Sequence, residues 1–212
     1  MMKKFTLSLV ILLIICFAVP AFPQTHLVTL DLIANENGNS PFITHLYQHG
    51  HFSTWFLAPL TGKWMQLGAG VKQDIKGIKT TWLLASLFSS NADQKRIELE
   101  GVLPIIFVTA EKGSGKLELQ NRYYIEFPTE KISYEWLRSD LTFGRSFRFG
   151  ARNELKVLEK EDKKAGEKQV SSRLGPIIKY SFSSKASVYL WFGWDVSSGT
   201  LKTIMASTTV KF

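Results

Sequence analysis

Histidine and serine residues gather in one short stretch of this 212-residue sequence, and they are the side chains best suited to nucleophilic chemistry. His45, His49, His51 and Ser53 fall in this stretch, and His26 is the only other histidine before it or after it. His51 and Ser53 are two positions apart, so a strand would place both side chains on one face. The imidazole of His51 could then act as a base for the Ser53 hydroxyl, as a nucleophilic hydrolase requires.

The His-x-Ser spacing resembles that of outer-membrane phospholipase A and of the lipid A deacylases, which cut lipid esters at the membrane surface. The resemblance covers three residues, Thr54 stands where those families have Asn, and no third residue is evident that would orient His51. In the alternative interpretation, His49-Gly50-His51 forms a hairpin turn and Ser53 faces water. Ester hydrolysis by His51 and Ser53 is therefore the secondary hypothesis.

Other chemical motifs are absent from the sequence. It contains no Gly-rich phosphate-binding loop, no His and Cys cluster at metal-ligand spacing and no GxSxG elbow. We therefore expect no cofactor and no metal site. The single cysteine, Cys16, lies in the apolar amino-terminal run, so the chain after that run can form no disulfide.

The elements that would position these side chains are strands, because apolar and polar residues alternate with a period of two along most of the chain. The longest segments exceed the mean strand length of soluble sheets, about 5–6 residues, and could cross a bilayer at a tilt. The sequence predicts twelve strands, at 26–34, 42–48, 51–58, 64–73, 77–88, 96–109, 115–127, 130–142, 145–157, 170–183, 186–196 and 200–212. If 42–58 is instead one bent strand, the number of strands falls to eleven or ten.

The two faces of these strands differ in charge. In 115–127, Leu117, Leu119 and Ile125 alternate with charged residues, and in 96–109 we expect Leu103, Ile105 and Phe107 to share an apolar face with Ile97 and Leu99. An apolar outer face and a polar inner face are the pattern of transmembrane β-barrels. A soluble antiparallel sandwich would show the same alternation with the apolar face inside.

Charged residues on the inner face would line the lumen of such a barrel. Arg148, Arg152, Arg173 and Lys179 on neighbouring strands predict a basic strip that favours anionic solutes, although mixed charges could also pair and plug the lumen. Lys116, Lys131, Glu135, Asp195 and Lys202 are expected on the same faces. The predicted channel-lining residues are Arg96, Glu98, Glu100, Glu118, Arg122, Glu126, Arg148, Arg152, Glu154, Arg173 and Lys179.

Both ends of the chain indicate export. Lys3 and Lys4 precede an apolar run that ends at Val19-Pro20-Ala21, which is typical of a secretory signal peptide cleaved after Ala21. The last strand alternates strictly and ends on Phe212, with Val210 on the same face. This ending resembles the signal by which the barrel-assembly machinery of Gram-negative bacteria recognises its clients.

The whole of 26–212 resembles the small bacterial outer-membrane β-barrels, including monomeric channels for acidic sugars. The predicted fold is an all-β, antiparallel up-and-down transmembrane β-barrel of twelve strands, or ten, formed by residues 22–212 after a signal peptide at 1–21. The resemblance implies outer-membrane localisation and a narrow polar channel for passive diffusion of small solutes, including anionic ones. The alternatives are a lipid esterase or deacylase and a plugged structural barrel.

Charge sets the expected partners. The formal net charge is +8 at pH 7, with the basic residues dispersed along strand-like segments. In an exported chain this pattern favours phosphate-rich lipid headgroups or passing anions over nucleic acid. We therefore expect outer-membrane lipid and lipopolysaccharide, the barrel-assembly machinery and small solutes as partners, and no nucleic acid.

Overall fold

The structure is a computed structural model that describes residues 25–35, 38–91, 96–127, 131–159 and 168–212. The predicted signal peptide, residues 1–21, lies outside the described residues. No helix in the described part of the chain is long and apolar enough to cross a membrane.

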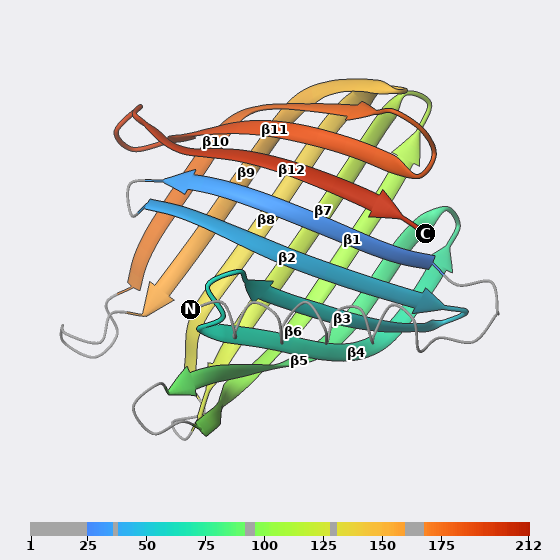
Figure 1. Cartoon of the computed structure of the whole chain (residues 1–212). Coiled ribbons are helices and arrows are strands. Elements are labelled where there is room, and N and C mark those ends of the chain that lie inside the picture. Colours follow the sequence, from blue (N-terminus) through green and yellow to red (C-terminus); the bar gives the residue numbers. More distant parts are fainter. Residues whose placement is uncertain (1–24, 36–37, 92–95, 128–130, 160–167) are drawn as a thin grey trace.

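The described residues form twelve antiparallel strands that close into one barrel (Figure 1). Each strand pairs with its sequence neighbours, and the first strand closes the barrel against the last. The predicted all-β, twelve-stranded up-and-down barrel is confirmed, and 42–58 is two strands rather than one. The strands are β1 (Thr25–Asn35), β2 (Gly38–His49), β3 (Phe52–Pro59), β4 (Trp64–Ile75), β5 (Ile78–Asn91), β6 (Arg96–Lys112), β7 (Gly115–Glu126), β8 (Lys131–Gly144), β9 (Phe147–Glu159), β10 (Lys168–Ser181), β11 (Ala186–Asp195) and β12 (Leu201–Lys211).

One end of the barrel carries the start of β1 and the end of β12. There the backbones of His26 and Phe212 exchange two hydrogen bonds, with N to O distances of 3.3 and 3.0 Å. The turns at this end are tight, and Gly113 between β6 and β7 has a φ of 60°, a left-handed conformation that glycine adopts without steric cost. We call this the short-turn end.

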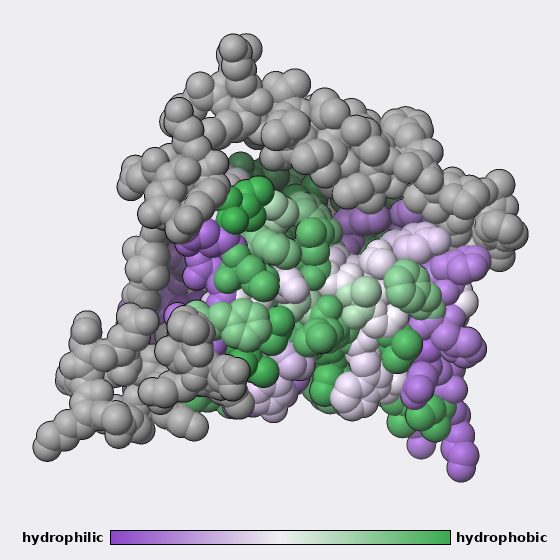
Figure 2. All heavy atoms as spheres, turned by 90° about the horizontal axis from the view of Figure 1, so that it is seen from below, coloured by the Kyte–Doolittle hydropathy of each residue, from purple (hydrophilic) through white to green (hydrophobic). Residues whose placement is uncertain are grey.

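The outer wall of the barrel is apolar. Large hydrophobic side chains stand exposed on strands around the barrel, among them Leu32 on β1, Trp82 on β5 and Val170 on β10. Figure 2, which views the molecule from below, shows apolar side chains over the middle of this face and hydrophilic ones toward its ends. At the short-turn end the exposed aromatic residues include Phe143, Phe147, Phe149, Tyr180, Phe182 and Phe212, as expected of an interfacial aromatic girdle.

The inside of the barrel is not uniformly polar. Trp55, Leu57, Leu83, Ala85, Leu103 and Ile105 form a buried cluster from β3, β5 and β6. Partly buried side chains from these and the flanking strands pack against it, and we call the whole group the apolar cluster. The added side chains are Phe42, Leu46, Trp64, Leu87, Phe107 and Tyr124.

The expectation that Leu103, Ile105 and Phe107 face outward was therefore wrong. The cause is an irregularity in the β5–β6 pairing, where Leu87 pairs with Gly101 but Phe88 pairs with Leu99. The extra residue, Glu100, exchanges the two faces of β6 at that point, as a β-bulge does. Leu99 before it is exposed, whereas Leu103 after it is buried.

Candidate channel interior

The strand registers determine which predicted lining residues face the lumen. The buried side chains of Trp136, Asp140 and Arg152 mark the inner face on β8 and β9, and the antiparallel pairing extends that face to the neighbouring strands. Arg96 is the first residue of β6, and its side chain lies outside the described residues. The other predicted lining residues share the inner face, namely Glu98, Glu100, Glu118, Arg122, Glu126, Arg148, Arg152, Glu154, Arg173 and Lys179.

Of three further charged residues that the sequence indicates for the inner face, one lies on the opposite face. Glu135 pairs with Tyr123 and Val157, which places it on the outer face. Lys202 is the residue skipped where the β11–β12 register shifts. The side chain of Lys131 lies outside the described residues.

Arg152 is a structural residue of the interior. Its Nε donates to Asp140 Oδ1 at 2.7 Å and its Nη2 to Asp140 Oδ2 at 2.8 Å, and each side chain is only 1% exposed. The guanidinium also lies over the rings of Tyr189 and Trp191, with 4.7 and 5.3 Å to the ring centroids. Because the guanidinium is buried among these rings, the Asp140 carboxylate and Met205 Sδ, Arg152 does not present its charge to a passing solute.

Lys179 is engaged in a second group of ion pairs nearer the short-turn end. Its Nζ donates to Glu118 Oε2, and Asp140 Oδ2 lies 3.9 Å away. Lys116 reaches the other oxygen of Glu118 at 3.1 Å. The Glu118 carboxylate is thus shared by two lysines, and β10 is tied to β7 across the intervening strands.

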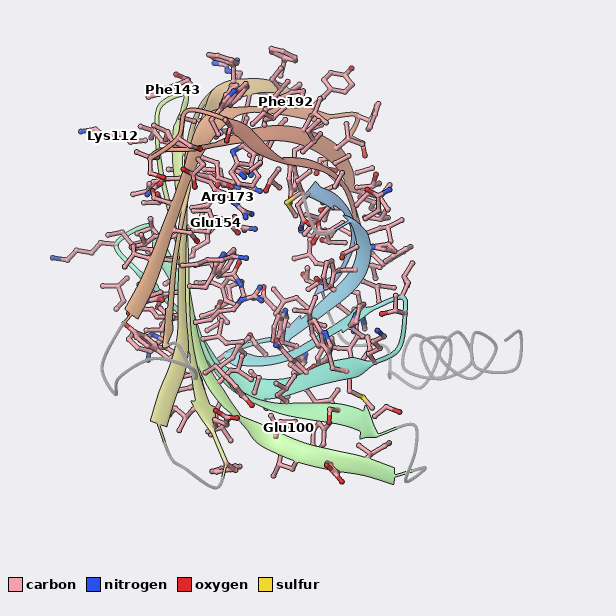
Figure 3. All side chains as sticks on the ribbon, turned by 90° about the vertical axis from the view of Figure 1, so that its left-hand side faces the viewer. Glu100, Lys112, Phe143, Glu154, Arg173 and Phe192 are labelled. Atoms are coloured by element: carbon pink, nitrogen blue, oxygen red, sulfur yellow. The ribbon has the colours of Figure 1, made fainter. Side chains whose placement is uncertain are left out.

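Arg173 and Glu154 project from neighbouring strands into the barrel. Figure 3, a view along the barrel, shows both pointing inward from β10 and β9, and an opening remains among the side chains drawn. Arg173 Nη1 donates to Thr203 Oγ1 at 2.7 Å and lies 4.0 Å from Glu154 Oε2. Trp136 Nε1 donates to Glu154 Oε1 at 2.5 Å, which fixes the carboxylate beside the guanidinium.

Arg122 links the charged wall to the apolar cluster. Its guanidinium lies between the rings of Trp55 on β3 and Trp136 on β8, 5.0 and 4.7 Å from their centroids. Cation–π contacts of this kind are worth up to about 2 kcal/mol when desolvated. The side-chain oxygen of Gln120, in the amide orientation that satisfies both groups, accepts from Arg122 Nη2 and Nε at 2.5 and 2.7 Å.

Arg138 has a different environment from the other inner arginines. Its guanidinium lies 5.7 Å from the ring centroid of Trp136. Among the described residues it has no carboxylate within ion-pair distance, and its Nε has no hydrogen-bond partner. Arg138 therefore adds a guanidinium to the inner face that forms no ion pair in the described part of the chain.

The sequence reasoning missed Trp55, Trp136, Arg138 and Asp140. Trp136, Arg138 and Asp140 do alternate along β8, but Glu135 and Ser139 on the opposite face made that face equally acceptable as the inner one. Trp55 lies in a segment that is apolar on both faces. Only the register of the neighbouring strands resolves these cases.

His51 and Ser53 do not form a catalytic pair in this geometry. Ser53 is fully buried on the inner face of β3, and its hydroxyl has no hydrogen-bond partner among the described residues. His51 is exposed in the β2–β3 turn, and its Nδ1 lies 3.1 Å from the carbonyl oxygen of Lys72. The arrangement gives the esterase hypothesis no support.

Comparisons with known proteins give likeness at the level of the fold. No protein-family model matches the chain, and no curated protein matches it. The solved structure of the NanC porin matches with a TM-score of 0.57 and 12% identity, covering 88% of this chain and 98% of that one. The KdgM porin, solved in complex with disordered oligogalacturonate, matches with a TM-score of 0.55 and 8% identity, covering 89% and 98%. The chain therefore has the β-barrel fold of bacterial outer-membrane porins.

Proposed function

We propose that this protein is an outer-membrane channel through which small polar solutes, including anions, diffuse passively. The observation that carries the proposal is the pair Glu154 and Arg173, which project into open space inside a closed barrel with an apolar outer wall (Figure 3). Fold likeness to the NanC and KdgM porins supports it. Fold alone does not determine function, so the polar lumen is the main argument.

The route to the membrane is part of the proposal. Residues 1–21 act as a signal peptide, and residues 22–212 form the mature barrel. Val210 and Phe212 face outward on the last strand, where Val210 pairs with Val28 of β1 and Phe212 is well exposed. This position suits recognition by the barrel-assembly machinery before β12 closes against β1, and the apolar wall suits contact with outer-membrane lipid and lipopolysaccharide.

The interior charges favour a weak preference for anions. Lys179 and Arg152 are paired with Glu118 and Asp140, and we expect Arg138, Arg148 and Arg173 to be among the positive groups that act on a solute. Arg173 is itself 4.0 Å from Glu154. We expect the selectivity to be modest because most fixed charges in the lumen cancel within contact distance.

Solute flux into liposomes tests this function. Liposomes that contain the refolded protein should swell in small sugars and more slowly in larger ones. In a salt gradient, the sign of the reversal potential should show that anions permeate more easily than cations. Arg138→Gln should reduce that potential, whereas Lys63→Gln, in an exposed turn between β3 and β4, should not. Liposomes that do not swell in any solute, with the barrel folded, would show a plugged structural barrel.

A further inference from the structure

A hollow opens on the surface at the short-turn end of the barrel. It lies between the β8–β9 turn and the β10–β11 turn and has a volume of about 500 Å³. We call it the Arg–Ser hollow, and its lining residues are Arg145, Ser146, Arg148, Ser181, Phe182, Ser183 and Ser184. The lining thus brings together two arginines and four serines, and none of these lining residues carries a carboxylate.

Hydrogen bonds between and within the two turns hold the hollow in shape. The backbone N of Ser181 donates to the carbonyl oxygen of Ser146 at 2.7 Å, which joins one turn to the other. Ser183 Oγ accepts from the backbone N of Lys185 and of Ala186, each at 3.1 Å. Because its oxygen is the acceptor in both bonds, the Ser183 hydroxyl keeps its proton for another partner.

The positive charge of the hollow is not neutralised by the protein. Within the described part of the chain, Arg145 has no ion pair and no hydrogen-bond partner for its side chain. Arg148 has one long bond, from Nη1 to the carbonyl oxygen of Ser114 at 3.5 Å. The inner arginines Arg152 and Arg173, in contrast, each lie beside a carboxylate.

The donors of the hollow fit a phosphate group. Guanidinium groups bind phosphate oxygens in a bidentate manner, and such charge-assisted bonds are stronger than neutral ones. Serine hydroxyls add donors at other angles, which suits a tetrahedral group with oxygens on several sides. A planar carboxylate would leave most of these hydroxyls without an acceptor.

The position of the hollow allows two sources of phosphate. Arg148 and Ser181 lie on the inner face of β9 and β10, at the mouth of the lumen. Phe182 is exposed on the outer side and packs edge to face on Tyr180, with 4.8 Å between ring centroids. The hollow therefore borders both the lumen and the lipid-facing girdle of aromatic residues.

We propose that the Arg–Ser hollow binds a phosphate group, either of a solute at the lumen mouth or of a lipid headgroup at the short-turn end. The site goes beyond the proposed channel function, because it needs the folded barrel but does not need an open lumen. Arg145 is its principal ligand, since it is the guanidinium without another partner among the described residues.

The test is a binding titration on the refolded full-length protein in a phosphate-free zwitterionic detergent. Calorimetry with inorganic phosphate and with glycerol phosphate measures the solute arm, with chloride at equal concentration as the reference anion. Mixed micelles that contain phosphatidylglycerol or phosphatidylcholine measure the lipid arm. Arg145→Gln should weaken binding about tenfold, and Lys76→Gln, in the β4–β5 turn at the same end, should leave it unchanged.

Each outcome has a defined meaning. Binding of inorganic phosphate that Arg145→Gln weakens supports the site and assigns a soluble source. Preference for phosphatidylglycerol alone, lost in the same variant, supports the site and assigns a lipid source. Absence of both, or equal binding by Arg145→Gln and Lys76→Gln with the fold retained on an unboiled gel, overturns the proposal.

Discussion

The two halves of the barrel interior are built by opposite means. Strands β2 to β6 fill their side of the lumen with the apolar cluster around Trp55 and Leu83, whereas β7 to β10 carry a network of ion pairs that includes Asp140–Arg152 and Glu118–Lys179. The apolar half narrows the lumen by packing, and the charged half sets its electrostatics. We therefore expect channel width and channel selectivity to respond to substitutions in different halves of the barrel.

Arg122 lies on the boundary between the two halves. It is the cation held between Trp55 of the apolar half and Trp136 of the charged half. The contact joins β3 to β7 and β8, and β3 is not a neighbour of either strand in the sheet. A substitution in one half that disturbs Arg122 should therefore also affect the other half.

The largest effect should come from breaking the buried pair in the charged half. Asp140→Asn leaves the Arg152 guanidinium buried without its counter-charge, and breaking a pair of this kind costs about 3–5 kcal/mol. Urea unfolding in detergent, followed by tryptophan fluorescence, measures the loss. Stability equal to that of the unsubstituted protein would show that the pair is solvated, and the contrast between the halves would fail.

The apolar half should respond to Trp55→Ala with a wider lumen. The substitution removes a buried indole and one side of the Arg122 contact, which costs about 3 kcal/mol or more in a packed core. Single-channel conductance should rise. The matched control is Trp82→Ala, because Trp82 is half exposed on the outer wall, and its conductance should not change; a rise in both variants would contradict the assignment of faces.

A smaller effect, on selectivity, should follow Glu118→Gln. The change removes a carboxylate that Lys116 and Lys179 share, so the lumen gains positive charge without losing packed volume. The reversal potential in a salt gradient should move toward anions while conductance stays within the range of the unsubstituted channel. An unchanged reversal potential would mean that these lysines do not face the permeation path, and a move toward cations would contradict the charge assignment.

The smallest effect should be that of Glu111→Gln. Glu111 lies 3.6 Å from Lys116 but its side chain is 53% exposed, and exposed ion pairs contribute about 1 kcal/mol or less. Urea unfolding should detect little change. A loss as large as that of Asp140→Asn would show that burial is not what separates the strong pairs from the weak ones.

Much of the fold could be predicted from sequence because side chains along a strand point to the same face at every second residue. The alternation in 115–127 and the strict pattern before Phe212 needed no tertiary information, and all twelve strands lie where the pattern placed them. The turn at Gly50 and His51 carries a weaker signal, because the sequence of 42–58 also fits one bent strand.

The interior was harder to predict, since the face that points inward depends on pairing rather than on composition. The extra residue Glu100 turned Leu103 and Ile105 inward, and no local signal marks it. The pattern also cannot tell a free arginine from a paired one. Arg148 and Arg152 both occupy the predicted inner face of the same strand. Arg152 is nevertheless buried against Asp140, whereas Arg148 lies at the lumen mouth.

Conductance of the refolded protein in a planar bilayer tests the central claim most directly. The lumen described here, open beside Glu154 and Arg173 and narrowed by the apolar cluster, predicts discrete current steps that are small and weakly anion-selective. A protein that migrates faster unboiled than boiled on a gel, and so is folded, but that gives no steps would contradict the claim of an open channel.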